Sequence, residues 1–313
     1  MRRKHGYDTL RESGFKDLRK WRQERARKMK SKDFTWNVPS ETPDISFLNN
    51  NSSMPSVTWI GHSTFLIQHS GLNIVTDPVW ALQMGFQKRL TNPGIPIADM
   101  PPVDIVLISH SHYDHLHMRS LLALKGSKML IVPVGLADMM RRKGFTSVVE
   151  LSWWESTTIG GVSITFVPSQ HWTRRTLLDM NRSHWGGYVI QSHTERNDTA
   201  AEPMPAVYFA GDSGYFDGFK AIGERFDIDI ALMPIGAYDP EWFMGPQHVT
   251  PEEALRAFID IGARRFVPMH YGSFRLADDT PREALDRLEA EWDRLGIDEE
   301  RLVVLPHGRT WQA

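Results

Sequence analysis

One stretch of the chain decides its fold: His110-Ser111-His112-Tyr113-Asp114-His115, which packs four candidate metal ligands into six residues. It follows an apolar run, 103–109, which predicts a buried strand. Because side chains two apart on an extended backbone share one side, His110 and His112 can point to one place. Asp114 and His115 come where the chain can turn, so one loop could hold two metal ions. The alternative is a polar cluster on a surface loop.

Three further candidate ligands follow predicted strands in the same way. His171 comes shortly after the β-rich run 162–167, Asp212 follows 206–210, and His270 follows 265–269 directly. Layered α/β folds build their sites at the carboxyl ends of strands. Repetition of this arrangement along one chain predicts a common cavity and argues against a chance surface cluster.

The candidate ligands are rich in nitrogen and contain no thiolate. Three imidazoles suit one ion and two imidazoles with a carboxylate suit a second, and the two oxygens of Asp212 make it the natural bridge. Such ligands favour two divalent ions, with Zn²⁺ preferred and Fe or Mn left open. Two ions about 3.5–4 Å apart can ionise a bridging water to hydroxide, so the pattern indicates hydrolysis. The set is His110, His112, Asp114, His115, His171, Asp212 and His270.

Composition limits the class of protein. The 313 residues are 41% hydrophobic, which is enough for a large core, and there is no cysteine. The absence of cysteine excludes disulfides and fits a reducing compartment. We see no apolar stretch typical of a signal peptide or of a membrane span. The expectation is a soluble cytoplasmic protein, with peripheral contact to a membrane surface left open.

Charge is distributed unevenly along the chain. Residues 1–33 carry 13 Lys and Arg against 5 Asp and Glu, whereas the whole chain has a net charge of −2. Apolar residues at intervals of three to five would give this arm a basic amphipathic helix, a type that often lies on anionic membranes. The alternatives are a helix that clasps the domain through the same residues, or a disordered tail. The apolar residues are Tyr7, Leu10, Phe15, Leu18 and Trp21.

The remaining pattern predicts two parts, a basic arm and connector over 1–50 and a hydrolase domain over 51–313. Strands are expected at 57–60, 63–68 and 72–76, and a long loop rich in Pro and Gly at 78–102. Capping boxes at Thr250 and Thr280, each followed by Pro, predict helices that end near Gly262 and Gly296. Two packed mixed sheets flanked by helices would bring the ligands to one edge.

These residues resemble the metallo-β-lactamase superfamily, an αβ/βα sandwich with a metal site at its rim. Within it, the chain is similar to the branch of phospholipases D that hydrolyse N-acyl-phosphatidylethanolamine, over roughly residues 55–310. The segments that carry this likeness are Thr58-Trp59-Ile60-Gly61-His62, Thr76-Asp77-Pro78, Leu107-Ile108-Ser109-His110, Pro168-Ser169-Gln170-His171-Trp172, Phe209-Ala210-Gly211-Asp212, Pro234-Ile235-Gly236-Ala237-Tyr238, Trp242-Phe243-Met244, Gln247-His248-Val249 and Pro251-Glu252-Glu253-Ala254.

The resemblance implies a ligand set, a reaction and a substrate. One ion would be held by His110, His112 and His171, and the other by Asp114, His115 and His270, with Asp212 between them. It also implies cleavage of N-acyl-phosphatidylethanolamine to phosphatidic acid and an N-acylethanolamine. His117 departs from the acidic residue expected after the histidine run, so the substrate's head group stays open.

Other residues receive roles as hypotheses. We expect Asp114, Asp212 and His248 to take part in catalysis, the aspartates by steering the nucleophile and His248 by contacting a phosphate oxygen or the leaving group. Substrate contacts are expected from Tyr113, Trp172, Gln247 and His248. Asp77 is expected to fix the tautomer of a ligand histidine. His62 is interpreted as a core or supporting histidine, and Arg174 and Arg175 as more typical of exposed arginines than of a phosphate fork.

Rival functions remain at this point. The same fold could hydrolyse a lactone, a cyclic nucleotide or another phosphodiester. A nucleic-acid-processing protein using the basic arm is disfavoured, because the rest of the chain is acidic and no recognition module is visible. A protein that only stores metal is disfavoured by the complete ligand set. The expected partner is a phospholipid or another phosphodiester substrate, and the oligomeric state is not predicted.

Overall fold

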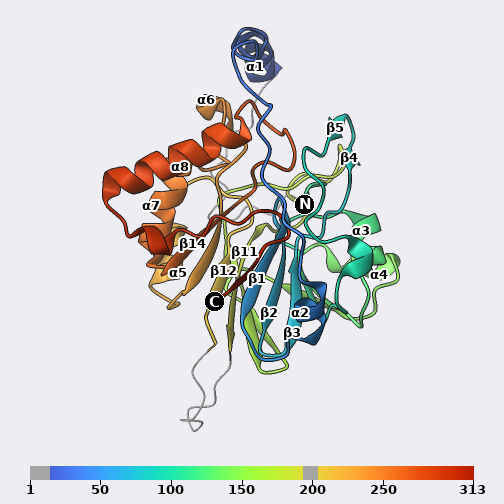
Figure 1. Ribbon diagram of the computed structural model, residues 1–313. Coiled ribbons are helices and arrows are strands. Elements are labelled where there is room, and N and C mark those ends of the chain that lie inside the picture. The colour runs from blue at the N-terminus through green and yellow to red at the C-terminus, as the bar shows by residue number, and fades with distance from the viewer. Residues whose placement is uncertain (1–14, 193–203) are drawn as a thin grey trace.

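The computed structural model describes residues 15–192 and 204–313 of the chain (Figure 1). Two mixed β-sheets pack face to face at its centre, and helices cover the outer side of each (Figure 1). The predicted α/β sandwich of two mixed sheets flanked by helices is therefore confirmed. Tyr7 and Leu10 lie outside the described residues.

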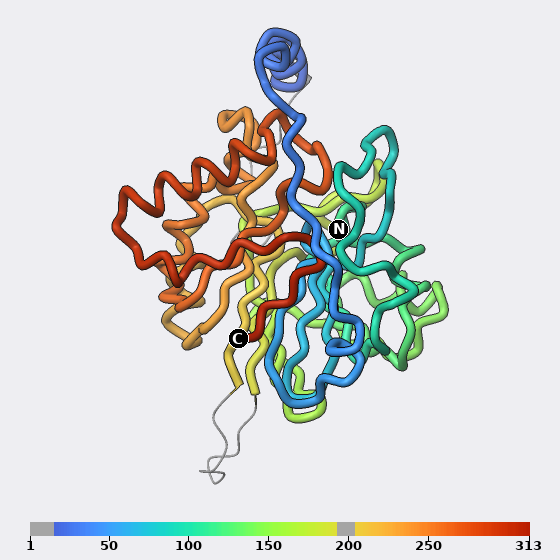
Figure 2. The backbone as a smooth tube through the Cα atoms, viewed as in Figure 1, coloured from blue at the N-terminus to red at the C-terminus, as the bar shows by residue number. Residues whose placement is uncertain are grey.

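The first sheet is antiparallel at one edge and parallel at the other. Figure 2 shows the end of the chain, in dark red, returning to the blue strands, where it forms the edge strand beside β1. In spatial order the strands are β15 (Thr310–Gln312), β1 (Ser56–Gly61), β2 (Thr64–His69), β3 (Leu72–Thr76), β6 (Ile105–Leu107), β7 (Met129–Pro133) and β8 (Val148–Leu151).

The second sheet has parallel strands on one side and a meander on the other. Its order is β14 (Arg265–Met269), β13 (Ile230–Pro234), β12 (Val207–Phe209), β11 (Gly186–Ser192), β10 (Val162–Pro168) and β9 (Ser156–Ile159). A separate short hairpin consists of β4 (Gln83–Met84) and β5 (Gln87–Lys88).

The helices fall into two groups by the sheet that they cover (Figure 1). Those beside the first sheet are α2 (Ile45–Asn50), α3 (Met118–Ala123) and α4 (Ala137–Arg142), and those beside the second are α5 (Gly218–Gly223), α7 (Pro251–Ile261) and α8 (Pro281–Leu295). The others are α1 (Phe15–Lys28), α6 (Glu241–Met244) and two 3₁₀ turns, η1 (Ile97–Asp99) and η2 (Glu299–Arg301).

Alternation along the strands divides the apolar residues between two cores. In β2, Phe65 and Ile67 face the core between the sheets, whereas Leu66 faces the core under α2, α3 and α4. In β6, Ile105 faces the former and Val106 the latter. Because successive side chains of a strand point to opposite faces, a strand buried on both sides reads as an unbroken apolar run.

Capping residues close in sequence determine where the two helices near the site begin and end. Thr250 and Thr280 each form the predicted capping box, with Pro in the first turn. Gly262 and Gly296 end these helices in the left-handed conformation, with φ of 74° and 62°. A residue with a β-carbon is strained there, which explains glycine at both ends.

Two features of the connecting segments were not foreseen. Trp80, in the loop predicted over 78–102, is buried and donates its indole N–H to Ile95 O. Val38 and Leu48, from the predicted connector, contribute to the two cores. The division at residue 50 stays a prediction. Within the described ranges, the structure contains no helix with both the length and the apolar character that a membrane span requires.

Candidate metal centre

His110, His112 and His171 converge on one point, which we call the first corner of the site. The loop after β6 carries His110 and His112, and their nearest ring nitrogens, Nε2 and Nδ1, lie 2.8 Å apart. His171, which follows β10, brings its Nε2 to 3.2 Å from the same Nδ1. Because strand ends of both sheets reach the same rim, residues about sixty positions apart meet at one corner.

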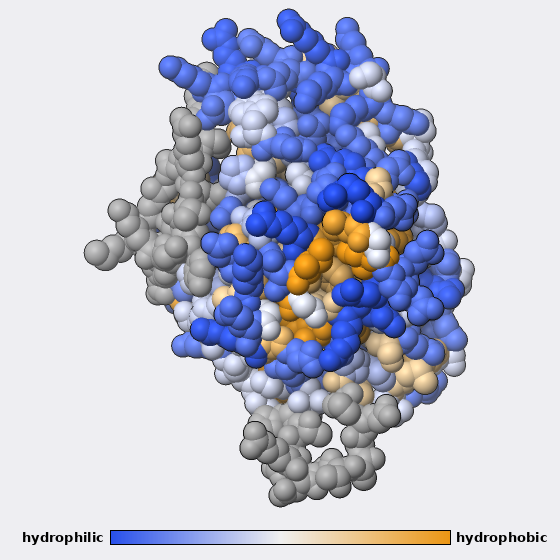
Figure 3. Space-filling model, turned by 90° about the vertical axis from the view of Figure 1, so that its left-hand side faces the viewer, coloured by the Kyte–Doolittle hydropathy of each residue, from blue (hydrophilic) through white to orange (hydrophobic). Residues whose placement is uncertain are grey.

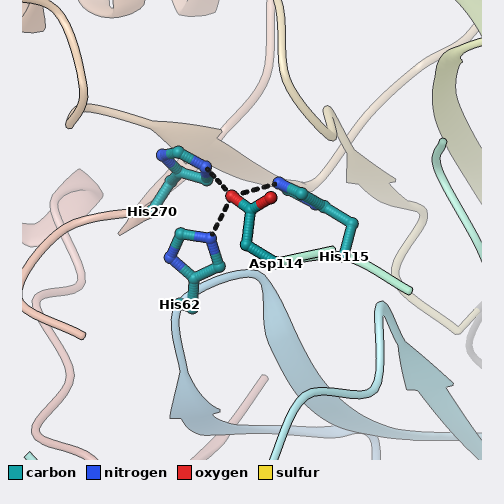
Figure 4. A group of neighbouring side chains, drawn as sticks. All are labelled: His62, Asp114, His115 and His270. Carbon is teal, nitrogen blue, oxygen red and sulfur yellow. Dashed lines mark hydrogen bonds and ion pairs between the residues drawn. The ribbon is translucent and has the colours of Figure 1, made fainter. Parts of the chain in front are cut away.

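A second corner contains the carboxylate of Asp114, and Figure 4 shows three imidazoles directed toward it. Asp114 Oδ2 lies 3.4 Å from His115 Nε2 and 3.7 Å from His270 Nε2. His62 Nε2 is closer still, at 3.1 Å. These four side chains come from the turn after β1, the ligand loop and the end of β14, and together they could hold a metal ion.

Asp212 lies between the two corners. Its Oδ2 is 3.8 Å from His171 Nε2 and 3.2 Å from His115 Nε2, while Oδ1 is 3.1 Å from His270 Nε2. The carboxylate is 3% exposed. An oxygen aimed at each corner is the geometry that a bridging ligand needs.

Outer contacts hold several of the rings in place. Asp77 Oδ2 lies 2.7 Å from His115 Nδ1 and accepts the Ser109 hydroxyl at 2.5 Å, and that hydroxyl lies 2.9 Å from His110 Nδ1. Asp77 therefore touches a histidine of the cluster, as its sequence context predicted. The main-chain oxygen of Gln247 lies 3.0 Å from His171 Nδ1. A partner on Nδ1 fixes the orientation of the ring and directs Nε2 inward.

Burial and mutual contacts distribute charge unequally over the cluster. Burial holds the pKa of His110 and His171 well below its ordinary value and lowers that of His112 to about 4. Burial opposes charge on His270 too, but the Asp212 charge and the hydrogen bonds to Asp114 and Asp212 together outweigh it and raise the pKa to about 9. The Asp212 carboxylate, helped by Asp114, raises the pKa of His115. His110, His112 and His171 are thus neutral imidazoles. At the other corner, protons on His115 and His270 balance the carboxylate charge, and a bound cation would replace these protons.

Buried atoms without hydrogen-bond partners test whether a metal fits. Within this cluster of described residues they are His62 Nδ1, His112 Nε2, His115 Nε2, Asp212 Oδ1, His248 Nδ1, and Nδ1 and Nε2 of His270. Polar atoms buried without partners are costly. His115 Nε2, His270 Nε2 and Asp212 Oδ1 all face the space between the carboxylates, so divalent cations would satisfy them. The donor set fits the predicted ions.

His62 was not included among the expected ligands. It has φ of 58°, and its ring lies against that of His270 with centroids 4.1 Å apart. The structure groups it with Asp114, His115 and His270. Its sequence signal was present in Gly61-His62 directly after a strand, the same context that singled out the other histidines.

The expected substrate-contacting residues line one side of the cluster. Trp172 stacks edge-on against His112, with ring centroids 4.6 Å apart, and its indole donates to Gln247 Oε1. His248 Nδ1 lies 3.8 Å from Asp212 Oδ2, and burial lowers its pKa to about 4. Tyr113 is 55% exposed and donates to Arg175 O. Their assignment as substrate contacts stays a prediction.

The paired arginines differ in what they contact. Arg175 Nη1 donates to the carbonyl oxygens of Ser111 and Leu116, at 2.7 and 2.9 Å, so it braces the ligand loop. Arg174 Nε donates to Thr176 O within its own loop. His117 takes the N-cap position of α3, where its Nδ1 accepts from Ser120 N. Arg175 therefore lies behind the ligand loop, where its charge acts on His112, and His117 caps a helix.

Comparison with known proteins gives the same family. A family model described as "Beta-lactamase superfamily domain" matches residues 72–271. The "N-acyl-phosphatidylethanolamine-hydrolyzing phospholipase D, mitochondrial" of Saccharomyces cerevisiae is 37% identical over 251 residues, which are 75% of this chain and 52% of that protein. This chain thus spans about half the length of the yeast relative.

Two further matches extend the comparison. "N-acyl-phosphatidylethanolamine-hydrolyzing phospholipase D 1" of Caenorhabditis elegans is 34% identical over 277 residues, covering 82% of this chain and 75% of the relative. Among solved structures, an isothiocyanate hydrolase from Delia radicum gut bacteria superimposes with a TM-score of 0.67 at 21% identity, covering 82% of this chain and 98% of the other. At that identity the structural match shows a shared fold.

Proposed function

Because the chain belongs to the metallo-β-lactamase superfamily of metal-dependent hydrolases, and within it to the branch of N-acyl-phosphatidylethanolamine-hydrolysing phospholipases D, we propose that it is itself a phospholipase D of this type. It would cleave N-acyl-phosphatidylethanolamine to phosphatidic acid and an N-acylethanolamine. The substrate class comes from the names of the relatives, and the chemistry comes from the arrangement of the cluster.

One observation carries the proposal: two corners of histidine and aspartate side chains with Asp212 directed at both. The first corner would bind one divalent ion, and Asp114, His115 and His270 the second. Two such ions, most suitably Zn²⁺, would supply acidified water and neutralise the phosphate's charge. This chemistry suits a phosphodiester, whose non-bridging oxygens carry negative charge throughout the reaction.

The chain's own residues then have separate tasks. Asp114 and Asp212 would orient the attacking water through their carboxylate oxygens. His248, neutral at ordinary pH because its pKa is lowered to about 4, can donate one hydrogen bond to a phosphate oxygen or to the leaving oxygen. Trp172 and Tyr113 lie at the edge of the cluster, where an acyl-bearing substrate would pass.

The reaction balances as a hydrolysis at phosphorus. The water oxygen forms a new P–O bond, and the bond from phosphorus to the oxygen of the N-acylethanolamine breaks. One proton of the water goes to that leaving oxygen, so the products are phosphatidic acid and an alcohol. No covalent intermediate with the protein is required, and we find no Gly-x-Ser-x-Gly motif in the sequence.

The test uses the purified full chain with zinc and N-acyl-phosphatidylethanolamine in nonionic detergent. Hydrolysis in H₂¹⁸O is expected to place the label in phosphatidic acid and not in the N-acylethanolamine. Asp212→Asn is expected to lose roughly a thousandfold or more in kcat/KM, because a bridging carboxylate becomes a neutral amide. The matched control Asp293→Asn changes an exposed aspartate of α8 and is expected to keep full activity.

Other substrates separate this proposal from its rivals. A lactone, a cyclic nucleotide and a bis-aryl phosphate are assayed beside the lipid under the same conditions. A higher kcat/KM for one of these compounds, with the lipid left intact, would replace the proposed substrate but leave the assignment as a hydrolase unchanged.

A cytoplasmic location is part of the proposal, supported by the absence of cysteine.

A further inference from the structure

Large apolar residues are exposed on the segments that surround the metal cluster. Phe86, in the β4–β5 hairpin, is fully exposed, and Leu177 and Leu178 are 85% and 80% exposed. Tyr113 in the ligand loop and Trp242 on α6 are also exposed. A lone exposed apolar residue needs no explanation, but a group of them around a site marks an interaction surface.

Contacts or direct chain connection tie each of these segments to the cluster. The loop that holds Leu177 packs on the ligand loop, where the Arg175 guanidinium lies 4.2 Å from the Tyr113 ring. The hairpin continues into Arg89, which forms a β-bridge with Phe274, and the Phe274 ring lies edge-on against His62. Trp242 belongs to the helix that leads into Gln247 and His248. The exposed apolar side chains therefore flank the site rather than a remote face.

The basic helix α1 lies at the same end of the molecule as α6 and the hairpin (Figure 1). Its inner side is fastened to the body. Trp21 donates to Asp278 at 2.7 Å and stacks on Phe243, while Arg25 pairs with Asp278 at 3.0 Å. Trp242 in turn donates its indole N–H to Glu24. One of the alternatives for this arm, a helix held against the domain by its apolar residues, is thus observed at Trp21.

The outer side of α1 carries cations without exposed acidic residues among positions 16–30. The exposed basic residues of this segment are Lys16, Arg19, Lys20, Arg22, Arg27, Lys28 and Lys30. Asp17 and Glu24 are partly covered on the inner side. Figure 3 shows this end as strongly hydrophilic, with a separate apolar patch further down the same face. Lys20 lies 3.8 Å from Glu24 and Lys28 lies 3.6 Å from Asp239, but both remain exposed. This side therefore presents exposed cations to an anionic partner.

We propose that the exposed apolar residues around the site and the cationic side of α1 form one docking surface for an anionic lipid bilayer. The apolar tips would enter the interface while the cations lie against the head groups. A nucleic acid would match the charge but gives no reason for exposed Phe86, Leu177 and Leu178. The inference rests on the proposed lipid substrate, because it explains how that substrate reaches the cluster.

Sedimentation with vesicles tests the surface. The probes are phosphatidylcholine vesicles with and without phosphatidylglycerol, at physiological salt. Wild-type protein is expected to bind the phosphatidylglycerol vesicles, and Arg19→Glu/Arg22→Glu to lower the partition coefficient by about tenfold or more. The matched control Arg142→Glu/Lys143→Glu reverses exposed charges at the end of α4, away from this end of the molecule, and is expected to bind as wild type.

The apolar part needs its own variants. Phe86→Ser and Leu177→Ser/Leu178→Ser are expected to weaken binding, whereas Ile259→Ser, an exposed residue of α7, leaves it unchanged. All variants should hydrolyse detergent-dispersed lipid at the wild-type rate, which shows that they fold. Equal vesicle binding by wild type and variants, or binding of duplex DNA in place of vesicles, overturns the proposal. Vesicle binding without hydrolysis supports this surface and overturns the proposed function instead.

Discussion

His62 and Asp114 meet across the rim of the sandwich, with 3.1 Å between Nε2 and Oδ2. The backbone of His62 is held on both sides, since its N–H donates to Ser273 Oγ at 2.6 Å and its carbonyl accepts from the Trp59 indole at 2.9 Å. Holding a residue other than glycine at φ of 58° costs energy, so surrounding contacts must maintain it. The surrounding fold therefore holds His62 in place beside Asp114.

Removing the His62 ring should weaken the metal corner that contains Asp114. His62→Ala frees the Asp114 carboxylate to rotate, and we expect about a 10–100-fold loss of affinity for the second ion, as for other residues that orient ligands. His62→Gln has the same backbone strain but keeps a donor, so it should recover part of the loss. Metal content per chain and titration against a competing chelator measure the effect. Wild-type affinity in both variants would show that Asp114 does not depend on His62.

Metal removal should destabilise the protein. The cluster contains buried ring nitrogens and a carboxylate oxygen without hydrogen-bond partners, and ions that bind only the folded chain stabilise it by mass action. At a hundred times the dissociation constant, each site contributes about 2.7 kcal/mol, so chelation should lower Tm by roughly 5 °C or more. Calorimetry before and after zinc is restored checks this. Asp212→Asn should show a smaller shift, and an unchanged Tm in chelated wild type would contradict it.

The parts of the fold that were predicted well are those set by neighbours in sequence. The capping boxes gave α7 and α8 their first residues, and β14 appeared over the predicted range 265–269. The seven candidate ligands were singled out for the same reason, because each follows a strand; that these side chains lie close together is observed, and their binding of metal stays a prediction. The order of strands in each sheet depends on contacts between distant residues, which one sequence does not reveal.

What escaped prediction involves pairs that meet only in three dimensions. His62 follows a strand, as the candidate ligand histidines do, but it lies 52 positions from Asp114, so the sequence does not reveal that the two side chains meet. Trp21 reaches Asp278 from the other end of the chain. Arg175 also differs from what exposed arginines suggest, since its partners are carbonyl oxygens of the ligand loop.

Arg175 should matter for the metal loop, whereas Arg174 should not. A lysine at position 175 has a shorter side chain and no planar group to lie over Tyr113, so Arg175→Lys should loosen the bonds to the Ser111 and Leu116 carbonyls. We expect it to lower stability by about 1–3 kcal/mol and to weaken metal binding. Arg174→Lys is the control, because Arg174 contacts its own loop. Urea unfolding and metal titration measure both. A raised KM with unchanged metal affinity in Arg175→Lys would instead indicate contact with the substrate's phosphate.

The buried His307 gives a prediction for pH. It is fully buried, its ring lies edge-on to Trp59 with centroids 4.4 Å apart, and burial together with the charge of Arg89 lowers its pKa to about 3. The unfolded chain takes up a proton near pH 6.5, whereas the folded chain does not until about pH 3. The contribution of His307 is therefore fully present above pH 6.5 and is lost as the pH falls, by up to about 1.4 kcal/mol per unit.

The variant His307→Gln isolates this contribution, because its amide does not titrate. At pH 8 it should be less stable than wild type by about 1–3 kcal/mol, through lost packing against Trp59. That difference should shrink as the pH falls from 6.5 toward 5, since only wild type carries the penalty of a buried imidazolium beside Arg89. Titrations of the metal cluster affect both proteins equally and cancel. A difference that stays constant from pH 8 to 5 would mean that His307 is protonated as easily folded as unfolded.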